Sequence, residues 1–282
     1  MHNYRIGLRT ALAGFVLGVM ACSAASQEVS LPEKYKSSGA LKVGLQNQFP
    51  PMNYVDPNTK EFVGFNIDLW KALEPKLGVK AEFVVDAFPS LFPALDTGRS
   101  DVMATGVFDS AERRQKYTFV DYLTSGPVFA TSTARAETIK QLSDICGKSV
   151  GYRRAIASFG KVLEEFNRDE CVAKGLPEVK IVSDEMAPQM GLSQNRFEVG
   201  LLALEGFLYL QDTQKDTLVQ IGEPLRDWLF GIAFKKDDTE LRDAVAAALA
   251  ALIKDGTYGQ MLAKYNLTPM AVSDVEIDKG TY

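Results

Sequence analysis

Histidine is almost absent from this sequence of 282 residues. The single histidine is His2, so imidazole-dependent catalysis or a His-ligated metal site would rest on that one side chain. The sequence also lacks the G-x-x-x-x-G-K-[ST] and G-x-G-x-x-G loops that hold nucleotide phosphates. These absences argue against nucleotide-dependent enzymes and histidine-based hydrolases, and we expect neither a cofactor nor a metal ion.

An excess of basic charge is missing as well. The chain has 31 Lys and Arg against 36 Asp and Glu, which gives a formal net charge of -5. A nucleic-acid binder needs a basic surface, so this function is not expected. Beyond the N-terminus no apolar run reaches the length of about 18 residues that a membrane helix requires. With 46% hydrophobic and 24% charged residues, the composition is that of a globular protein.

The N-terminus has the pattern of a secretory signal peptide. Arg5 and Arg9 precede an apolar run over residues 10–21, and small residues follow it. The alternative is a retained anchor helix, and this run of about 12 residues is short for a membrane span. We expect residues 1–26 to be removed and the mature protein to lie in the periplasm.

The three cysteines fall into two groups. The stretch Val19-Met20-Ala21-Cys22 is similar to a lipobox, which makes Cys22 a candidate site for a lipid anchor. Cys146 and Cys171 then remain, and an even number of cysteines in an oxidising compartment favours a disulfide. Such a bond would close a loop of about 26 residues and stabilise the fold by roughly 3.5 kcal/mol. Two unrelated buried thiols are the alternative.

Short apolar runs alternate with amphipathic stretches in the mature chain, which is typical of an α/β fold. We expect Ser110 to cap a short helix through Lys116, and Pro75 to kink or end the helix that contains it. The expected strands cover residues 41–45, 81–85, 101–104, 148–152, 179–182, 197–202 and 228–234. The expected helices cover residues 65–77, 91–96, 158–166, 185–193, 203–210, 237–254 and 257–265.

These segments form two α/β units of similar size, which suggests two lobes. The extended segments 128–131 and 229–234 would cross between the lobes and act as hinges. We expect the first lobe to comprise residues 39–127 and 233–282, and residues 128–232 to form an inserted second lobe. The cleft between two such lobes is the natural place for a ligand.

Several short motifs follow one another between Gly39 and Tyr265. They are Leu41-Lys42-Val43-Gly44, Phe49-Pro50-Pro51-Met52, Gly64-Phe65-Asn66-Ile67-Asp68-Leu69, Phe92-Pro93-Ala94-Leu95, Gly98-Arg99-Ser100-Asp101-Val102, Ser110-Ala111-Glu112-Arg113, the stretch from Leu142 to Gly151, and Asp255-Gly256-Thr257-Tyr258. Their order and spacing resemble the periplasmic solute-binding proteins for polar amino acids, family 3. The resemblance implies a two-lobed periplasmic-binding-protein fold (type II) and a disulfide between Cys146 and Cys171. It also implies a small-molecule ligand and a partner, the ABC transporter permease in the inner membrane; we expect a monomer.

The resemblance further implies how the ligand is held. Arg113 matches an arginine that grips the α-carboxylate, since a planar fork of donors pairs bidentately with it. The alternative is an exposed helix charge, which is the interpretation for its neighbour Arg114. Phe49 and Phe88 match aromatic positions around the ligand side chain, with core packing as the alternative. The other candidate ligand-binding residues are Gln46, Thr105, Gly106, Phe108, Arg154, Ile156, Ser158 and Glu205.

Some positions depart from the family pattern. Phe108 stands where a Ser or Thr is usual, and Ala155-Ile156 replaces a Gly-Thr pair. Ala203 stands at the place of the Asp that binds the ligand's ammonium group, and Glu205 is the candidate substitute. Because an unpaired buried charge is costly, the ligand is either an amino acid served by another acid or a related derivative. An opine, or a cyclic or methylated zwitterion, could be held by aromatic faces.

Two other functions remain open. Some relatives of this fold resemble periplasmic cyclohexadienyl or arogenate dehydratases, whose reaction needs a cleft acid to protonate a leaving hydroxyl. Glu205 is the one candidate for that acid. The sensor half of a signalling receptor is the second, and the lack of a later apolar span argues against it. We expect a binding protein rather than an enzyme.

Overall fold

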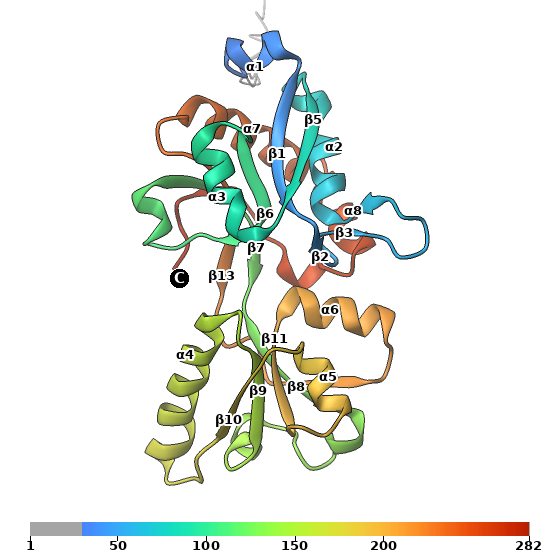
Figure 1. The fold of residues 1–282 in the computed structure, drawn as a ribbon, viewed down its shortest axis with the longest axis vertical. Helices are drawn as coiled ribbons and strands as arrows, with labels where there is room; N and C mark the ends of the chain where they lie inside the picture. Colours follow the sequence, from blue (N-terminus) through green and yellow to red (C-terminus); the bar gives the residue numbers. More distant parts are fainter. Residues whose placement is uncertain (1–29, 282) are drawn as a thin grey trace, which may run out of the picture.

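The computed structural model describes residues 30–281 and shows two lobes stacked along the long axis, each built on its own β-sheet (Figure 1). The two-lobed α/β architecture predicted from the sequence is confirmed. The expected signal peptide over 1–26, with His2 and Cys22, lies outside the described residues.

The first lobe contains a sheet of six strands. Their spatial order is β14 (Glu276–Ile277), β7 (Tyr117–Ser125), β13 (Trp228–Lys235), β6 (Val102–Phe108), β1 (Ala40–Gln46) and β5 (Lys80–Asp86). Strands β5, β1 and β6 are parallel, so their carboxyl ends lie at one edge of the sheet, which faces the second lobe (Figure 1). Ligands of open α/β sheets bind beyond such carboxyl ends.

Helices cover both faces of this sheet, and β6 shows why. Successive side chains of a strand point to opposite faces. Val102 and Ala104 belong to the larger core, which α2, α7 and α8 complete, whereas Met103 and Val107 pack with Leu91 of α3 on the other face. The helices of this lobe are α1 (Glu33–Ser38), α2 (Phe65–Leu77), α3 (Phe88–Thr97), α7 (Thr239–Lys254) and α8 (Thr257–Lys264).

The second lobe contains a sheet of five strands. Their order is β10 (Lys180–Asp184), β9 (Ser149–Arg153), β11 (Val199–Ala203), β8 (Pro127–Ser132) and β12 (Leu218–Ile221). Strands β10, β9 and β11 are parallel, and their carboxyl ends lie toward the first lobe (Figure 1). The helices of this lobe are α4 (Ala157–Phe166), α5 (Pro188–Ser193) and α6 (Leu204–Thr213). The two sheets therefore present their ligand-binding edges to each other.

The chain crosses between the lobes at two neighbouring points. Strand β7 ends at Ser125 in the first sheet, and β8 begins at Pro127 in the second. A Cβ on the intervening Gly126 would lie 1.9 Å from the carbonyl oxygen of Arg226, so only glycine allows the two crossing segments to approach so closely. Strand β13 pairs with β7 along its whole length in the first sheet. Residues 228–232 were expected in the second lobe, but they lie in the first lobe's sheet. The chain therefore returns from the second lobe to the first before Trp228.

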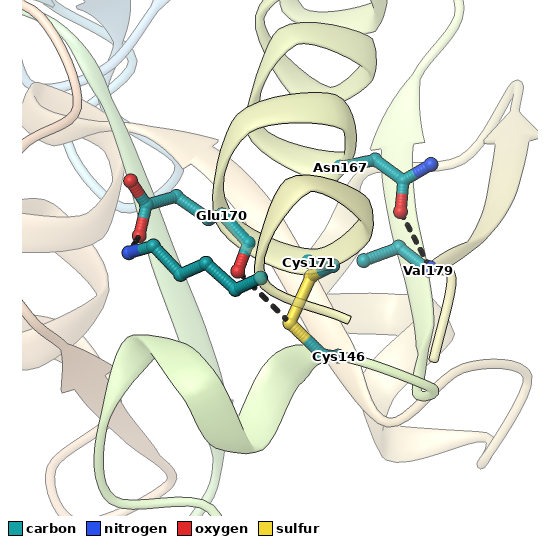
Figure 2. Close-up of a disulfide and its surroundings, with 6 residues drawn as sticks. Cys146, Asn167, Glu170, Cys171 and Val179 are labelled. Carbon is teal, nitrogen blue, oxygen red and sulfur yellow. Dashed lines mark hydrogen bonds and ion pairs between the residues drawn. A yellow bond between two sulfur atoms is a disulfide. The ribbon is translucent and has the colours of Figure 1, made fainter. Parts of the chain in front are cut away.

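The predicted disulfide between Cys146 and Cys171 is present, and it stays within the second lobe (Figure 2). Cys146 follows a 3₁₀ turn (Leu142–Ile145), and Cys171 ends a π-helical turn (Asn167–Cys171) that continues α4. The carbonyl oxygen of the Asn167 side chain accepts a hydrogen bond from the Val179 amide at 2.8 Å. The bond and this contact together fix the turn that leads from α4 to β10.

Local structure differs from expectation at several places, of which four bear on the site or the sheet. Helix α2 runs two residues past Pro75 and ends before Gly78, whose φ of 73° is left-handed. The helix expected from residue 185 begins only at Pro188, because the residue before a proline avoids helical angles. The helix expected after Ser110 is a single 3₁₀ turn (Arg113–Gln115). Strand β7 was not expected, since it is buried on both faces and has no alternating pattern.

Candidate ligand-binding site

A cavity of about 330 Å³ lies where the two lobes face each other. The first lobe contributes a turn after β1 that contains β2 (Gln48–Phe49). The second lobe contributes the ends of β9 and β11, the starts of α4 and α5, and one side of α6. The cavity is lined by Gln48, Phe49, Pro50, Arg153, Ile156, Phe159, Ala187, Pro188, Gln189, Leu201, Leu202, Ala203, Glu205, Gly206, Tyr209, Leu210 and Gln214. Its walls are mainly apolar with a few polar groups, the usual character of a small-molecule site.

Five aromatic rings form a continuous chain from the first lobe to the second, which we term the aromatic bridge. The ring centroids of Phe49 and Phe230 are 6.2 Å apart, and those of Phe230 and Phe108 are 4.6 Å apart. Phe108 contacts Trp228 at 5.0 Å, and Trp228 contacts Phe159 at 6.3 Å. Both ends of the bridge, Phe49 and Phe159, line the cavity. The core and pocket interpretations of Phe49 are therefore compatible, because its ring both packs against Phe230 and lines the cavity.

Gly106 allows the first-lobe end of this bridge to form. Its φ is 70°, and a Cβ there would lie 2.9 Å from Cε1 of Phe49 and 3.3 Å from the ring of Phe230. A larger residue would push these rings apart. Gly106 is a predicted site residue, and in the structure it lets the rings of Phe49 and Phe230 pack at the cavity wall.

Buried polar groups hold the end of β1 beneath Phe49. The hydroxyl of Thr105 accepts a hydrogen bond from the Gln46 amide at 3.1 Å, and the Asn53 amide group donates to the Gln46 carbonyl at 2.6 Å. Asn53 begins β3 (Asn53–Val55), which pairs with β2 and with β4 (Phe62–Val63). Thr105 is fully buried and neither residue lines the cavity, so their visible contacts support the cavity wall, and direct contact with a ligand stays a prediction.

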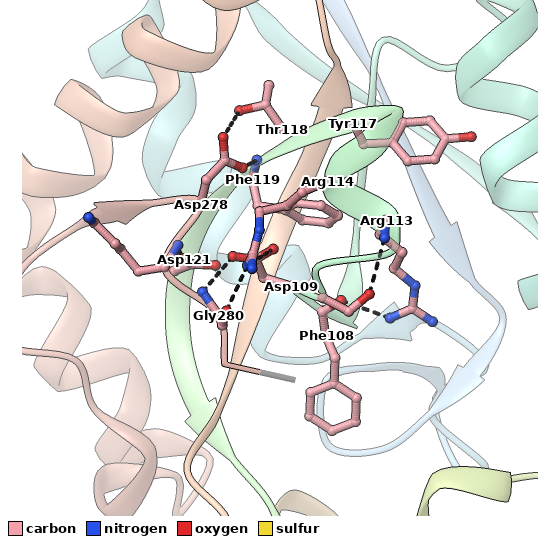
Figure 3. Close-up of polar contacts among 12 residues, drawn as sticks. Phe108, Asp109, Arg113, Arg114, Tyr117, Thr118, Phe119, Asp121, Asp278 and Gly280 are labelled. Carbon is pink, nitrogen blue, oxygen red and sulfur yellow. Dashed lines mark hydrogen bonds and ion pairs between the residues drawn. The ribbon is translucent and has the colours of Figure 1, made fainter.

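Arg113 lies beside the aromatic bridge, in the 3₁₀ turn that follows β6 (Figure 3). Its amide donates to Oγ of Ser110 at 3.2 Å, although Glu112, rather than the predicted Ser110, stands at the N-cap of the turn. Its Nη1 donates to the Phe108 carbonyl at 2.7 Å, and its guanidinium carbon is 5.7 Å from the ring centre of Phe92. The side chain is therefore held in a defined position at the carboxyl end of β6, and it does not line the cavity. Its role as carboxylate anchor stays a prediction.

Arg114 is not the exposed helix charge that was expected, because it binds a buried carboxylate. Its Nη1 lies 2.9 Å from Oδ1 of Asp109, a carboxylate with no exposed surface, and 2.7 Å from the Gly280 carbonyl (Figure 3). The Gly280 amide donates to the other oxygen of Asp109 at 2.6 Å. The sequence could not show this contact, because the partner lies 166 residues further along the chain.

The same C-terminal segment runs along β7 and places several carboxylates together. Asp278 accepts hydrogen bonds from the Phe119 amide and the Thr118 hydroxyl, both at 2.8 Å (Figure 3). Asp121 is buried nearby and accepts from the Lys279 amide at 3.1 Å. Burial, together with the neighbouring carboxylates, raises the pKa of Asp121 to about 7.

The two adjacent arginines of the second lobe have different surroundings. Arg154 forms an ion pair with Glu185 at 2.7 Å, and its Nε donates to Oγ of Ser183 at 3.2 Å. Arg153 ends β9 and lines the cavity instead. Successive strand residues point to opposite sides, so only one of the pair can face the ligand. The structure thus brings Arg153 to the site in place of the predicted Arg154.

Glu205 lies in the first turn of α6 and reaches the cavity wall, close to the crossing between the lobes. Its side chain is 2% exposed, and its Oε2 accepts a hydrogen bond from Oγ of Ser125 at 2.6 Å. Burial raises the pKa of this carboxyl group. Ala203 also lines the cavity and offers no charge there. Glu205 is therefore the acidic side chain among the described residues that line the cavity, and its role as substitute for the Asp stays a prediction.

The remaining predicted residues also fall into those that line the cavity and those that do not. Ile156 lines the cavity, whereas Ser158 and Phe88 do not, and Phe88 is 36% exposed at the start of α3. Sequence reasoning missed cavity residues on α5 and α6 because nothing in an amphipathic helix marks which turn faces a cleft. These are Gln189 and Tyr209, together with Gln48 of β2 and Gln214, which directly follows α6.

Within residues 30–281, no three His, Cys, Asp or Glu side chains are placed to hold a metal ion. In the same part of the chain, no helix has the length and apolarity needed to cross a membrane.

Residues 41–268 match the sequence profile of the bacterial extracellular solute-binding proteins, family 3. The chain belongs to this family. It is 29% identical over 265 residues to the L-cystine-binding protein TcyJ of Escherichia coli K12, an alignment that covers 94% of this chain and 96% of TcyJ. It is 25% identical over 242 residues to the arginine-binding protein ArgT of Corynebacterium glutamicum, covering 85% of this chain and 78% of ArgT. These relatives are named as binding proteins.

Solved structures of solute-binding proteins share the architecture. An ancestral cationic amino acid solute-binding protein has a TM-score of 0.70 at 29% identity, covering 83% of this chain and 98% of that one. The ytmK protein of Bacillus subtilis, described as a probable amino-acid ABC transporter extracellular-binding protein, has a TM-score of 0.72 at 22% identity, covering 82% of this chain and 98% of that one. This family member therefore has the type II periplasmic-binding-protein fold.

Proposed function

We propose that the protein is an extracytoplasmic receptor of an ABC importer that captures an amino acid between its lobes. The observation that carries the proposal is a cavity lined by both lobes in a chain that matches the family over residues 41–268. Relatives named for cystine, arginine and histidine support an amino acid as the ligand. Such a receptor binds, closes and delivers its ligand to a membrane permease.

In this proposal the two charged ends of the amino acid bind to different lobes. Arg113 takes the α-carboxylate, because its planar fork can donate two parallel hydrogen bonds. Glu205 takes the ammonium group, since Ala203 carries no charge and Glu205 lines the cavity. Burial raises the pKa of Glu205, and an ammonium group beside it would favour the ionised form. Phe49 and Phe159 enclose the ligand side chain from the two lobes.

The ligand would close the lobes by rotation about the crossings near Gly126 and Arg226. Two adjacent connections restrict the motion to a hinge bend, and a ligand that contacts both lobes favours the closed form. Small-angle scattering should show a smaller radius of gyration when the bound amino acid is present at saturation. An unchanged radius would contradict closure.

The experiment that tests the function is native mass spectrometry of freshly purified protein, followed by calorimetric titration with the twenty standard L-amino acids and L-cystine. We expect a co-purifying small molecule and saturable binding of at least one amino acid with one site per chain. Binding of none of them, with a chain shown to be folded by circular dichroism, would contradict an amino-acid receptor and favour an opine or a methylated zwitterion.

A second candidate function is a periplasmic enzyme of the cyclohexadienyl or arogenate dehydratase type. Glu205 favours it, because a buried carboxyl with a raised pKa can protonate a leaving hydroxyl. Incubation of the pure protein with prephenate or arogenate would produce aromatic absorbance if this function is correct. Loss of that absorbance in Glu205→Gln would assign the acid.

Export and assembly complete the proposal. Removal of residues 1–26 would release a periplasmic monomer, whereas lipid attachment at Cys22 would anchor it. Intact mass spectrometry of the protein recovered from the cell envelope distinguishes these outcomes. Light scattering of the same sample reports whether it is a monomer.

A further inference from the structure

Arg153 and Arg154 are neighbours in sequence with opposite roles in the second lobe. The guanidinium of Arg154 is held by Glu185 at 2.7 Å and by the carbonyl oxygen of Ser183 at 3.2 Å. Within residues 30–281, the side chain of Arg153 has no hydrogen bond or ion pair, and it lines the cavity. A guanidinium carries five N–H donors and stays charged at any physiological pH. Arg153 thus brings an uncompensated positive charge to the edge of the site.

The other charges of the site do not balance Arg153. Among the described residues that line the cavity, Arg153 and Glu205 are the charged ones. Glu205 is almost fully buried against Ser125 and lies on α6, whereas Arg153 is exposed at the end of β9. In the proposed function, Arg113 and Glu205 pair with the carboxylate and ammonium of the amino acid. Both charges of a simple zwitterionic ligand then have a partner, and the guanidinium of Arg153 has none.

Closure of the lobes makes this remaining charge costly. A guanidinium removed from water without a partner is destabilising, and a bidentate carboxylate is the partner that fits it best. A cationic side chain in the same place would add repulsion between like charges, and a neutral amide would leave the charge unpaired. The chemistry of Arg153 therefore favours one class of ligand over the others.

We infer that Arg153 selects an amino acid whose side chain carries a second carboxylate. The inference rests on the proposed function and deepens it, because it names the ligand class of the same site. Arg113, in the first lobe, would bind the α-carboxylate that all amino acids share. Arg153, in the second lobe, would bind the group that distinguishes them.

Matched acid and amide pairs test the inference. Calorimetric titration would compare L-glutamate with L-glutamine and L-aspartate with L-asparagine, and would add L-arginine as a cationic amino acid and L-cystine, which has a second carboxylate. We expect the acid of the preferred pair to bind at least about tenfold more tightly than its amide, as for a charge-assisted bidentate pair. Arg153→Ala should weaken binding of that acid by about 10- to 100-fold and change its amide by less than about threefold. Arg153→Lys should recover part of the loss, since an ammonium pairs without the planar fork.

Two control variants separate the possible outcomes. Arg154→Ala should leave all affinities unchanged, and Arg113→Ala should weaken acid and amide equally. The inference is overturned if an amide or a basic amino acid binds best, or if Arg153→Ala weakens acid and amide alike, as a contact that merely holds the lobes together would. If no amino acid binds to the folded wild-type protein, the proposed function fails and this inference fails with it.

Discussion

Replacement of Arg114 by alanine should destabilise the first lobe strongly. The guanidinium lies 2.9 Å from Oδ1 of Asp109, an ion pair rather than an aligned hydrogen bond, and donates to the Gly280 carbonyl at 2.7 Å. The Asp109 side chain has no exposed surface, and that of Arg114 is 23% exposed. After the change, the carboxylate would keep the Gly280 amide but lose its cation.

The size of the effect follows from the burial of Asp109. Removing one partner of a buried ion pair costs about 3–5 kcal/mol, because an uncompensated charge stays inside the protein. For a chain of this size each kcal/mol lowers the melting temperature by about 2–4 °C, so we expect a fall of roughly 6–20 °C. The pair of Arg154 with Glu185 is the matched control, since its side chains are 61% and 74% exposed. Arg154→Ala should cost no more than about 1 kcal/mol.

Thermal and urea denaturation of the ligand-free protein, followed by circular dichroism, measures both variants. The double variant Asp109→Asn/Arg114→Ala should recover part of the lost stability, because the carboxylate that needed a partner is gone. The reasoning would be refuted if Arg114→Ala and Arg154→Ala lowered the free energy of unfolding equally. It would also be refuted if the double variant were no more stable than Arg114→Ala alone.

Three other predictions concern binding, pH and the disulfide. Arg113→Ala should weaken amino-acid binding by about 2–5 kcal/mol in calorimetric titration, and a loss of less than about threefold in affinity would remove its role as anchor. Because the pKa of Asp121 is raised to about 7, the native state retains a proton that the unfolded chain releases above about pH 4. Stability should therefore fall as the pH rises from about 4 to about 7. Asp121→Asn should flatten that dependence and stabilise the protein by up to about 4 kcal/mol at about pH 8, as melting temperatures would show. Alkylation of the unreduced, unfolded mature protein should label neither Cys146 nor Cys171, and two labelled thiols would contradict the bond.

Much of the fold was predictable because its elements have local causes. The apolar spacing of α2 predicted its bounds, 65–77, as the structure has them, and the alternation of 81–85 predicted most of β5. Export chemistry and the resemblance predicted the disulfide within the second lobe. The strand β7 escaped prediction, because a strand buried on both faces lacks the alternation that marks a surface strand.

The candidate site was predictable only in part, since it depends on which side chains meet across the two lobes. Of the eleven residues predicted to bind the ligand, Phe49, Ile156 and Glu205 line the cavity, whereas the other eight, Arg113 among them, do not. Spacing along the chain locates the end of a strand or the start of a helix. It does not specify which residue at that end turns toward a partner lobe.

The sequence by itself determined most of the periodic elements and the two-lobed order of the chain, because these follow from local patterning, and the pairing of its two mature cysteines was implied by the family resemblance. Only the tertiary structure decided that Arg153 rather than Arg154 faces the cavity, and that Arg114 neutralises a buried Asp109 beneath the C-terminal segment. Both outcomes depend on contacts between distant parts of the chain. A charged side chain takes its role from the groups that surround it after folding, and residue type alone does not specify those groups.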